Sequence, residues 1–153
     1  MIEHHFESRT LLPISRKDVF PFFSDAANLG RLTPASLGFQ IRTPQPILME
    51  VGALIDYTIR LHGFPMRWRT KITRWNPPHE FVDEQLKGPY RTWIHHHTFE
   101  DTGDGHTLMR DHVRYSLPFQ PFGEIARPFV KAEIRKIFAY REQILEEIFP
   151  TPK

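Results

Sequence analysis

The segment from Phe81 to Tyr115 carries the strongest signal for the fold and reads FVDEQLKGPYRTWIHHHTFEDTGDGHTLMRDHVRY. Turn residues at Gly88-Pro89 and over 101–105 divide it into three strand-length segments. Side chains two positions apart along a strand lie on one face of a sheet. At that spacing one face carries Phe81, Asp83, Gln85, Trp93, His95, His97, Phe99, Met109, Asp111, Val113 and Tyr115. Such a mixture of rings, imidazoles and carboxylates is typical of a pocket wall, because an ordinary core face is mostly aliphatic.

Alternation of the same kind extends toward the N-terminus. It predicts strands over 3–12, 39–43, 53–61, 66–75, 80–87, 91–100 and 107–117. The connections from 44 onward are short and rich in Gly, Pro, Asn and Asp, as in hairpins between antiparallel neighbours. We therefore predict a seven-stranded antiparallel sheet.

Helical patterns occupy the two remaining parts of the chain. Two short helices are expected after the first strand, over 19–23 and from Asp25 or Ala26 to Leu32. After Pro121 the apolar spacing changes to three or four residues and gives one amphipathic helix that ends before Pro150. Pro128 lies in its first turns or marks a kink there. The fold class is α+β.

Composition limits the kinds of protein that this chain can be. Its 153 residues suit a single domain over 1–153, and 40% of them are hydrophobic. The absence of cysteine excludes disulfides and thiolate chemistry and agrees with a cytoplasmic location. The net charge of +2 does not imply a nucleic-acid partner. Neither a signal peptide nor an integral membrane segment is apparent.

The order of elements predicts a cavity. A seven-stranded sheet twists and curls, and one helix cannot fill its concave side, so a space remains between them. The alternative is a dry interior filled by Phe side chains. Of the two faces of the sheet, the one with more apolar surface is expected to be buried. On the middle strands this criterion places Tyr57, Trp68 and Thr70 on the inner face. The inward stripe of the long helix includes Phe129, Phe138 and the unusual charge Arg141, which pairs with a sheet carboxylate or contacts an acidic ligand.

Hairpin geometry places polar side chains near each other on the inner face. A turn at Gly88-Pro89 puts Asp83 opposite His95, and the next turn puts Asp111 opposite the same histidine. A slip of two residues would instead pair His97 with Asp111. In both registers an imidazole on the central strand is flanked by carboxylates from both neighbours, within reach of their side chains.

Three interpretations fit this polar row. It is a buried hydrogen-bonded network, a set of groups that orients or transforms a ligand, or a metal site built from two histidines and a carboxylate. The third is the weakest, because two aspartates beside one histidine suit charge pairing, so we assign no metal and no cofactor. The candidate catalytic residues are His95, Asp111 and Asp83. The candidate ligand-binding residues are Tyr57, Trp68, Thr70, Phe81, Gln85, Trp93, His97, Phe99, Met109, Val113, Tyr115, Phe129, Phe138 and Arg141.

The chain also resembles a known superfamily. The segments FVDEQ, GPY, WIHHHTF and HTLMRDHVRY are similar to those of SRPBCC ligand-binding proteins, which include START lipid-transfer domains and polyketide cyclase/dehydrase-like proteins. Small bacterial cyclase/dehydrase-like proteins are the most similar subgroup. The resemblance implies a helix-grip fold with a hydrophobic cavity beneath the C-terminal helix, and it implies no particular reaction.

We therefore expect a protein that holds one small hydrophobic or amphipathic molecule, lipid-like, aromatic or polyketide-like. The alternative is a cyclase, dehydratase or isomerase that uses a His–Asp pair as general acid or base. The expected partner is the small ligand, and a homo-oligomer is left open.

Overall fold

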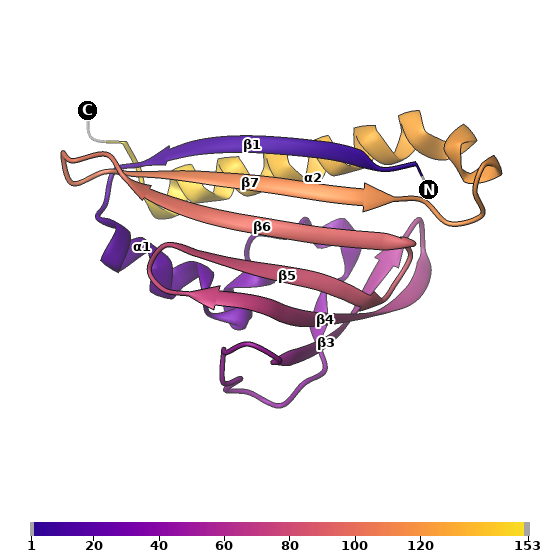
Figure 1. Ribbon diagram of the computed structural model, residues 1–153, viewed down its shortest axis with the longest axis horizontal. Helices are drawn as coiled ribbons and strands as arrows, with labels where there is room; N and C mark the ends of the chain where they lie inside the picture. The colour runs from indigo at the N-terminus through magenta and orange to yellow at the C-terminus, as the bar shows by residue number, and fades with distance from the viewer. Residues whose placement is uncertain (1, 152–153) are drawn as a thin grey trace.

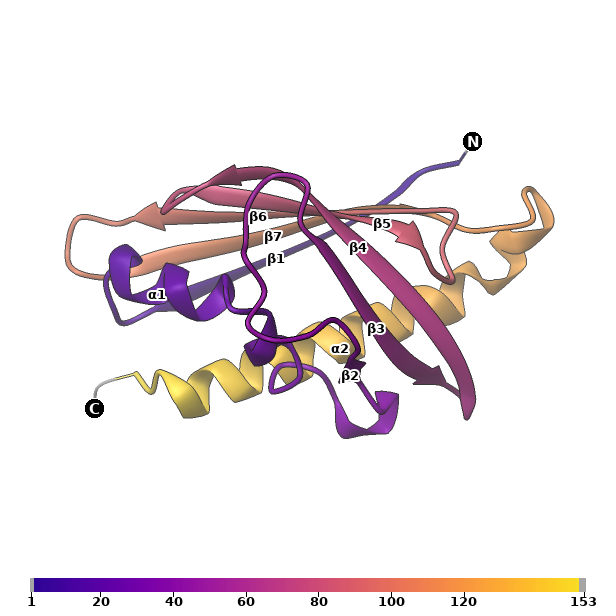
Figure 2. The same cartoon turned by 90° about the horizontal axis from the view of Figure 1, so that it is seen from below.

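One curved antiparallel sheet of seven strands wraps around a long helix in the computed structural model, which describes residues 2–151 (Figures 1 and 2). The expected domain of 1–153 also includes Met1, Pro152 and Lys153, which lie outside the described residues. In chain order the elements are β1 (His4–Leu12), α1 (Arg16–Phe23), η1 (Ala26–Leu29), η2 (Ala35–Leu37), β2 (Gln40–Ile41), β3 (Leu54–Leu61), β4 (Phe64–Asn76), β5 (Glu80–Lys87), β6 (Thr92–Asp101), β7 (Thr107–Ser116), η3 (Phe122–Ala126) and α2 (Arg127–Ile148).

The first strand lies beside the last one. The strand order is β1-β7-β6-β5-β4-β3-β2, so β3 to β7 form a meander and β1 closes the far edge against β7. The chain between β1 and β2 holds α1, η1 and η2, which cover one end of the concave side (Figure 2). The predicted fold class, a seven-stranded antiparallel sheet that grips a C-terminal helix, is confirmed.

Element boundaries differ from the sequence-based expectation in several places. The helix expected over 19–23 begins at Arg16, and the one expected to reach Leu32 is a 3₁₀ helix that ends at Leu29. The second strand covers only Gln40–Ile41, because the loop that follows it runs irregularly as far as β3. Strand β4 begins earlier and ends later than expected, as Phe64–Asn76. Of the two alternatives for Pro128, the structure has the first: it lies in the first turn of α2, where a backbone N–H would have no partner within the helix.

Two irregularities in the pairing of β4 with β5 accompany the curvature of the sheet: one leaves Leu86 of β5 without a partner across the two strands, and the other leaves Thr73 of β4 without one. The pairing of β4 with β5 shifts register between Arg69 and Thr70 and again between Ile72 and Arg74. Each such irregularity bends a strand and increases its twist. The bent half of the sheet, β3 and β4, therefore stands away from the flatter half formed by β5, β6, β7 and β1 (Figure 2).

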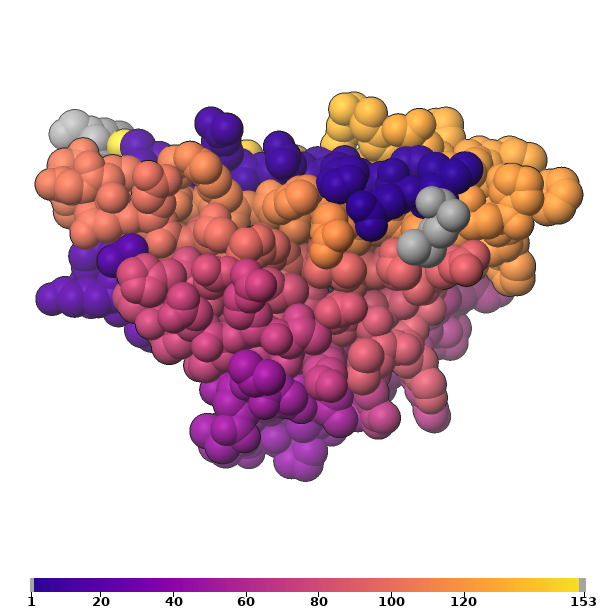
Figure 3. Space-filling view, viewed as in Figure 1, coloured from indigo at the N-terminus to yellow at the C-terminus, as the bar shows by residue number. Residues whose placement is uncertain are grey.

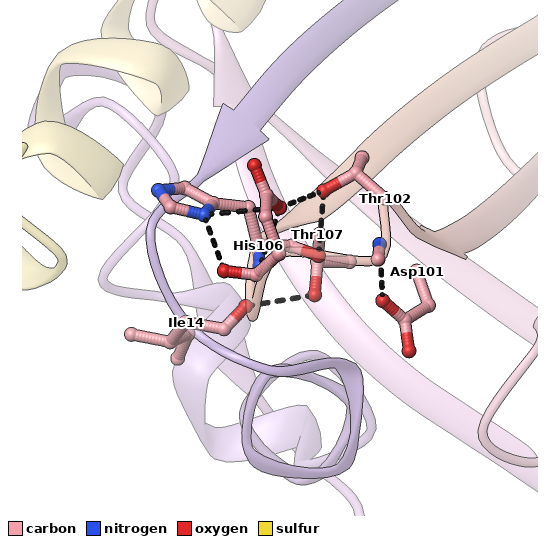
Figure 4. A network of polar contacts seen from close by, with 7 residues as sticks. Ile14, Asp101, Thr102, His106 and Thr107 are labelled. Atoms are coloured by element: carbon pink, nitrogen blue, oxygen red, sulfur yellow. Dashed lines mark hydrogen bonds and ion pairs between the residues drawn. The ribbon is translucent and has the colours of Figure 1, made fainter.

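Polar contacts fix the β6–β7 turn and connect it to the chain before α1 (Figure 4). The amide of Gly103 donates to the Asp101 carboxylate over 2.8 Å, which closes the turn. The hydroxyl of Thr107 donates to the backbone carbonyl of Ile14 over 2.8 Å. This turn sets the β6–β7 register, and the bond to Ile14 holds the start of α1 against the end of the sheet.

The buried side chains form two clusters along α2. One gathers around α1 and includes Leu12, Val19, Phe20, Leu32, Phe81, Phe99, Met109 and Leu145. The other lies at the opposite end of α2 and comprises Val113, Tyr115, Leu117, Ile134 and Phe138. Among the described residues, no helix combines the length and apolar character needed to cross a bilayer.

Candidate functional site

A cavity of about 210 Å³ lies between the concave face of the sheet and α2. Its walls come from β3, β4, β5 and β6, from the inner side of α2 and from the short helices that follow β1. Residues of both core clusters contribute to the lining, so the space separates the two parts of the core. The dry interior considered above is therefore not what this fold adopts.

One polar cluster interrupts this mostly apolar wall. Nε2 of His95 lies 2.7 Å from Oδ1 of Asp111, and Nε2 of His97 lies 2.6 Å from Oδ2 of Asp83. Nδ1 of His97 is 3.4 Å from Oδ1 of Asp111, and Nη2 of Arg141 is 3.3 Å from the same oxygen. Three adjacent strands and α2 thus bring two carboxylates, two imidazoles and one guanidinium together.

The register that creates this cluster is the slipped one of the two considered. His97 lies opposite Asp111, and His95 lies opposite Val113, so the expectation that Asp111 faces His95 is wrong for the backbone. Asp83 does lie opposite His95, as predicted, although its carboxylate bonds to His97. The side chains therefore pair diagonally across the strands.

Aromatic stacking holds the two imidazoles in place. The His95 and His97 rings are stacked with centroids 3.6 Å apart, and Phe81 stacks on the other side of His97 at 4.1 Å. Trp93 meets the His95 ring edge-on at 6.5 Å. A cationic imidazole benefits from a ring face, so the stack suits a charged His97 next to Phe81.

The surroundings push the two histidine pKa values apart. Burial lowers the pKa of His95, and the neighbouring His97 lowers it further, against the hydrogen bond to Asp111. Burial also opposes charge on His97, but its contacts with Asp111 and Asp83 outweigh that effect and raise its pKa. The neighbouring carboxylates therefore decide the direction of the pKa shift at His97, whereas burial and the neighbouring imidazole decide it at His95.

Charge is balanced within the cluster. Burial opposes ionisation of Asp111, yet the charge of Arg141 and the bonds from both histidines hold the pKa of Asp111 well below its ordinary value. Burial likewise opposes ionisation of Asp83, and the bond from His97 lowers the pKa of that carboxyl. Two carboxylates therefore face Arg141 and His97, whose cationic form they favour, while burial and the neighbouring His97 favour the neutral form of His95.

The proton positions follow from this balance. Because Asp111 is ionised, Nε2 of neutral His95 carries the proton and donates it to that carboxylate. Nδ1 of His95 is then a lone-pair acceptor, and it makes no hydrogen bond with the residues described here. His95 lines the cavity, so the site offers one neutral imidazole base that is oriented by a buried aspartate.

The geometry argues against a metal ion shared by the two imidazoles. Ligand atoms of Asp83, His95 and His97 do lie within 4.8 Å of one another. A metal binds an imidazole nitrogen in the plane of the ring at about 2.0–2.1 Å. The two ring planes are inclined by only 24° and lie face to face, so their lone pairs run side by side instead of converging. The cluster fits charge pairing better than coordination.

The structure brings most of the predicted site residues to the cavity. Those that line it are Tyr57, Trp68, Thr70, Phe81, Asp83, Trp93, His95, His97, Phe138 and Arg141. Asp111 is buried behind the two histidines and supports them without reaching the lining. Of the two partners considered for Arg141, the sheet carboxylate is the one it contacts.

Six predicted ligand-binding residues lie outside the lining, and their placement corrects the prediction. Phe99 and Met109 are covered by Phe20 of α1 and by Leu145 of α2 in one core cluster. Val113 and Tyr115 are covered by α2 and Phe6 in the other cluster. Phe129 is exposed on the first turns of α2. Gln85 turns back to bind the main chain of Tyr90, to which Nε2 of Gln85 donates over 2.7 Å.

Sequence reasoning missed lining residues in irregular segments. Tyr90 reaches the cavity because the side chain of Gln85 holds the backbone of Tyr90 in place. Glycine at position 88 leaves room for this glutamine, because a side chain there would collide with it. Phe22, Phe23 and Leu29 reach the cavity from α1 and η1. Only the Gly-Pro turn before Tyr90 indicated that a loop residue could reach the cavity. Loops and very short helices have no periodicity that defines an inward face. On β1, His4 is also buried, and its Nε2 lies 2.8 Å from Oε2 of Glu124.

An apolar cavity between a curved antiparallel sheet and a C-terminal helix, with convergent polar groups on its wall, defines a helix-grip protein. The chain belongs to the polyketide cyclase/dehydrase and lipid transport family, whose model matches residues 3–141. No curated protein matches the sequence.

Solved structures with the same fold are distant in sequence. A protein from Thermus thermophilus has a TM-score of 0.74 at 14% identity, over 94% of this chain and 95% of that one. The Zhui aromatase/cyclase from Streptomyces has a TM-score of 0.75 at 12% identity, over 94% and 92% of the two chains. Truncated norcoclaurine synthase from Thalictrum flavum has a TM-score of 0.70 at 15% identity, over 99% and 96%. At these identities the likeness concerns the fold alone.

Proposed function

We propose that the protein binds one small, mainly aromatic molecule in the cavity, with an oxygen substituent directed at the polar cluster. The observation that carries this proposal is the lining, in which aromatic and aliphatic side chains surround a space with one oriented imidazole acceptor, that of His95. The volume of about 210 Å³ is below the roughly 300–1,000 Å³ of pockets for drug-sized ligands, which favours a compact molecule.

A second polar atom on the wall supports the same proposal. Nε1 of Trp68 is buried and has no hydrogen-bond partner among the described residues. Leaving a buried donor unpaired costs about 1–3 kcal/mol, and a ligand oxygen can satisfy it. Trp68 lines the cavity between the stacked ring of Tyr57 and the edge-on ring of Trp93. A ligand with oxygens at two positions fits this wall better than a plain hydrocarbon.

Intrinsic fluorescence tests the proposal, because Trp68 and Trp93 line the cavity. Titration with 2-naphthol is expected to change this fluorescence in a saturable manner, and naphthalene, which has no hydroxyl, is expected to bind about tenfold more weakly. Ile137→Trp fills the lined space from α2 and is expected to abolish binding. Leu86→Trp, at an exposed position of β5, serves as the matched control. Equal binding by both variants contradicts the proposal.

A second candidate function is proton transfer by His95, and its free Nδ1 lone pair next to a buried aspartate favours it. In this role Nδ1 takes a proton from the carbon beside a ketone, and the proton returns to the resulting enolate. Exchange of the acidic C–H of 2-tetralone in D₂O, followed by NMR, reports this step without a known substrate. We expect His95→Gln to slow the exchange by about 10²-fold, and His96→Gln on the outer face to leave it unchanged. Equal rates in the two variants exclude this role.

A further inference from the structure

Four large apolar side chains project into solvent where β7 leads into α2. Their exposed fractions are 84% for Phe119, 77% for Phe122, 85% for Ile125 and 56% for Phe129. We call these four residues the apolar ridge. The segment that carries them projects at one end of the molecule beyond the end of β7 (Figures 1 and 3). Single exposed apolar residues are ordinary, whereas a contiguous group points to a binding surface.

Local structure aligns the ridge on one side. Phe122 and Ile125 belong to the 3₁₀ helix η3, in which residues three apart eclipse each other. Ile125 and Phe129 are four apart across the start of α2, which again places them on one side. Phe119 has a φ of +58°, a conformation rarely adopted by a bulky side chain. The chain therefore accepts local strain at a position where the ring gains little burial.

The ridge continues into the cavity wall. Along α2 the row of residues four apart that begins with Phe129 continues to Glu133 and Ile137, and the last two line the cavity. The Phe129 ring also contacts His62 at the tip of the β3–β4 hairpin, with centroids 4.9 Å apart. Leu61, next to His62, lines the cavity as well. The exposed surface and the internal space are thus adjacent parts of the same helix and hairpin.

The charged residues that neighbour the ridge in the sequence indicate what kind of surface it meets. Residues 119–136 contain four cations and two carboxylates, namely Arg127, Lys131, Arg135, Lys136, Glu124 and Glu133. Glu124 is engaged by His4 at 2.8 Å, and Glu133 faces the cavity, whereas the four cations are exposed. A second copy of this surface would bring like charges together, while an anionic lipid surface attracts them.

We propose that the apolar ridge docks on an anionic membrane surface, with the aromatic side chains inserted between headgroups and the cations on the lipid phosphates and carboxylates. This inference goes beyond ligand binding in solution. Docked in this way, the end of the cavity bordered by Leu61 and Glu133 lies close to the bilayer, where a hydrophobic molecule can enter or leave without crossing water.

Sedimentation with vesicles tests this docking. We expect the protein to bind vesicles of phosphatidylcholine and phosphatidylserine mixed roughly 2:1, and to bind pure phosphatidylcholine much less. The double variant Phe122→Ser/Ile125→Ser is expected to lose at least about tenfold in partitioning. The matched control is Leu11→Ser/Leu86→Ser, which removes two exposed leucines elsewhere and should bind as the unmodified protein does. Arg127→Glu/Lys131→Glu is expected to abolish the preference for the anionic vesicles.

Three results overturn the proposal. They are absence of vesicle binding by the unmodified protein, equal binding by the ridge and control variants, and a dimer in light scattering that the ridge variant converts to a monomer. The last result would assign the ridge to a second copy of the chain. Titration of the ridge variant with 2-naphthol keeps this test separate from the proposed function, because binding in the cavity should be unchanged in solution.

Discussion

The buried pair of Asp111 and Arg141 allows a stringent test of the charge balance described above. Asp111→Asn preserves the shape of the side chain but leaves Arg141 and protonated His97 facing one carboxylate instead of two. Removing one partner of a buried ion pair typically destabilises a protein by about 3–5 kcal/mol. At about 2–4 °C per kcal/mol for a chain of this length, the melting temperature should fall by roughly 6–20 °C.

The magnitude rests on the contacts that the substitution disturbs. Oδ1 of Asp111 lies 2.7 Å from Nε2 of His95, 3.3 Å from Nη2 of Arg141 and 3.4 Å from Nδ1 of His97, and the carboxylate is only 2% exposed. Arg141→Met removes the opposite charge, including the guanidinium that lies over the Phe138 ring, while keeping an apolar side chain of similar length. The double variant has one carboxylate, Asp83, and one cation, His97, so its charges balance again.

Urea unfolding of the two single variants and the double variant measures the coupling. We expect the double variant to be more stable than the sum of the single effects predicts, by about 2 kcal/mol. The exposed pair Asp56–Arg69, joined at 2.7 Å, provides the matched control cycle and should couple more weakly because water screens it. Additive effects at Asp111 and Arg141 would refute the charge-balanced cluster.

Two further predictions concern titration and packing. NMR titration should show His97 protonated to a higher pH than the ordinary pKa of 6.5 and His95 only at a lower pH. The stability contributed by charged His97 is therefore complete below pH 6.5 and is lost as the pH rises through the folded-state pKa of His97. The effect of His95 has the opposite sign, because its lowered pKa makes the fold less stable as the pH falls below 6.5. A common pKa for both histidines would contradict the assignment. In the core, Leu145→Ala should lower the free energy of unfolding by about 2–5 kcal/mol in urea, and Leu48→Ala at an exposed position by less than about 0.5 kcal/mol. Similar losses for both leucines would show that the cluster at α1 is loosely packed.

The elements and their inward faces follow from the order of the amino acids alone. Period-two alternation places His95, His97 and Asp111 on one face whichever register is adopted, because a slip of two residues keeps every side chain on its own face. For the same reason the pattern could not decide whether Asp111 meets His95 or His97. That choice depends on the β6–β7 turn, where Asp101, Gly103 and neighbouring residues form a network of local hydrogen bonds.

Only the assembled tertiary structure decides which inward-facing residues line the cavity and which pack against other side chains. Met109 and Tyr115 lie on the inward face as Trp93 does, yet they are covered. Met109 packs in the cluster around Phe20 of α1, and Tyr115 packs in the cluster around Phe138 of α2. The cavity is shaped by the irregular pairing of β4 with β5 and by loop residues such as Tyr90, and neither leaves a periodic trace in the sequence. Curvature is a property of the assembled sheet, and alternation along a single strand does not encode it.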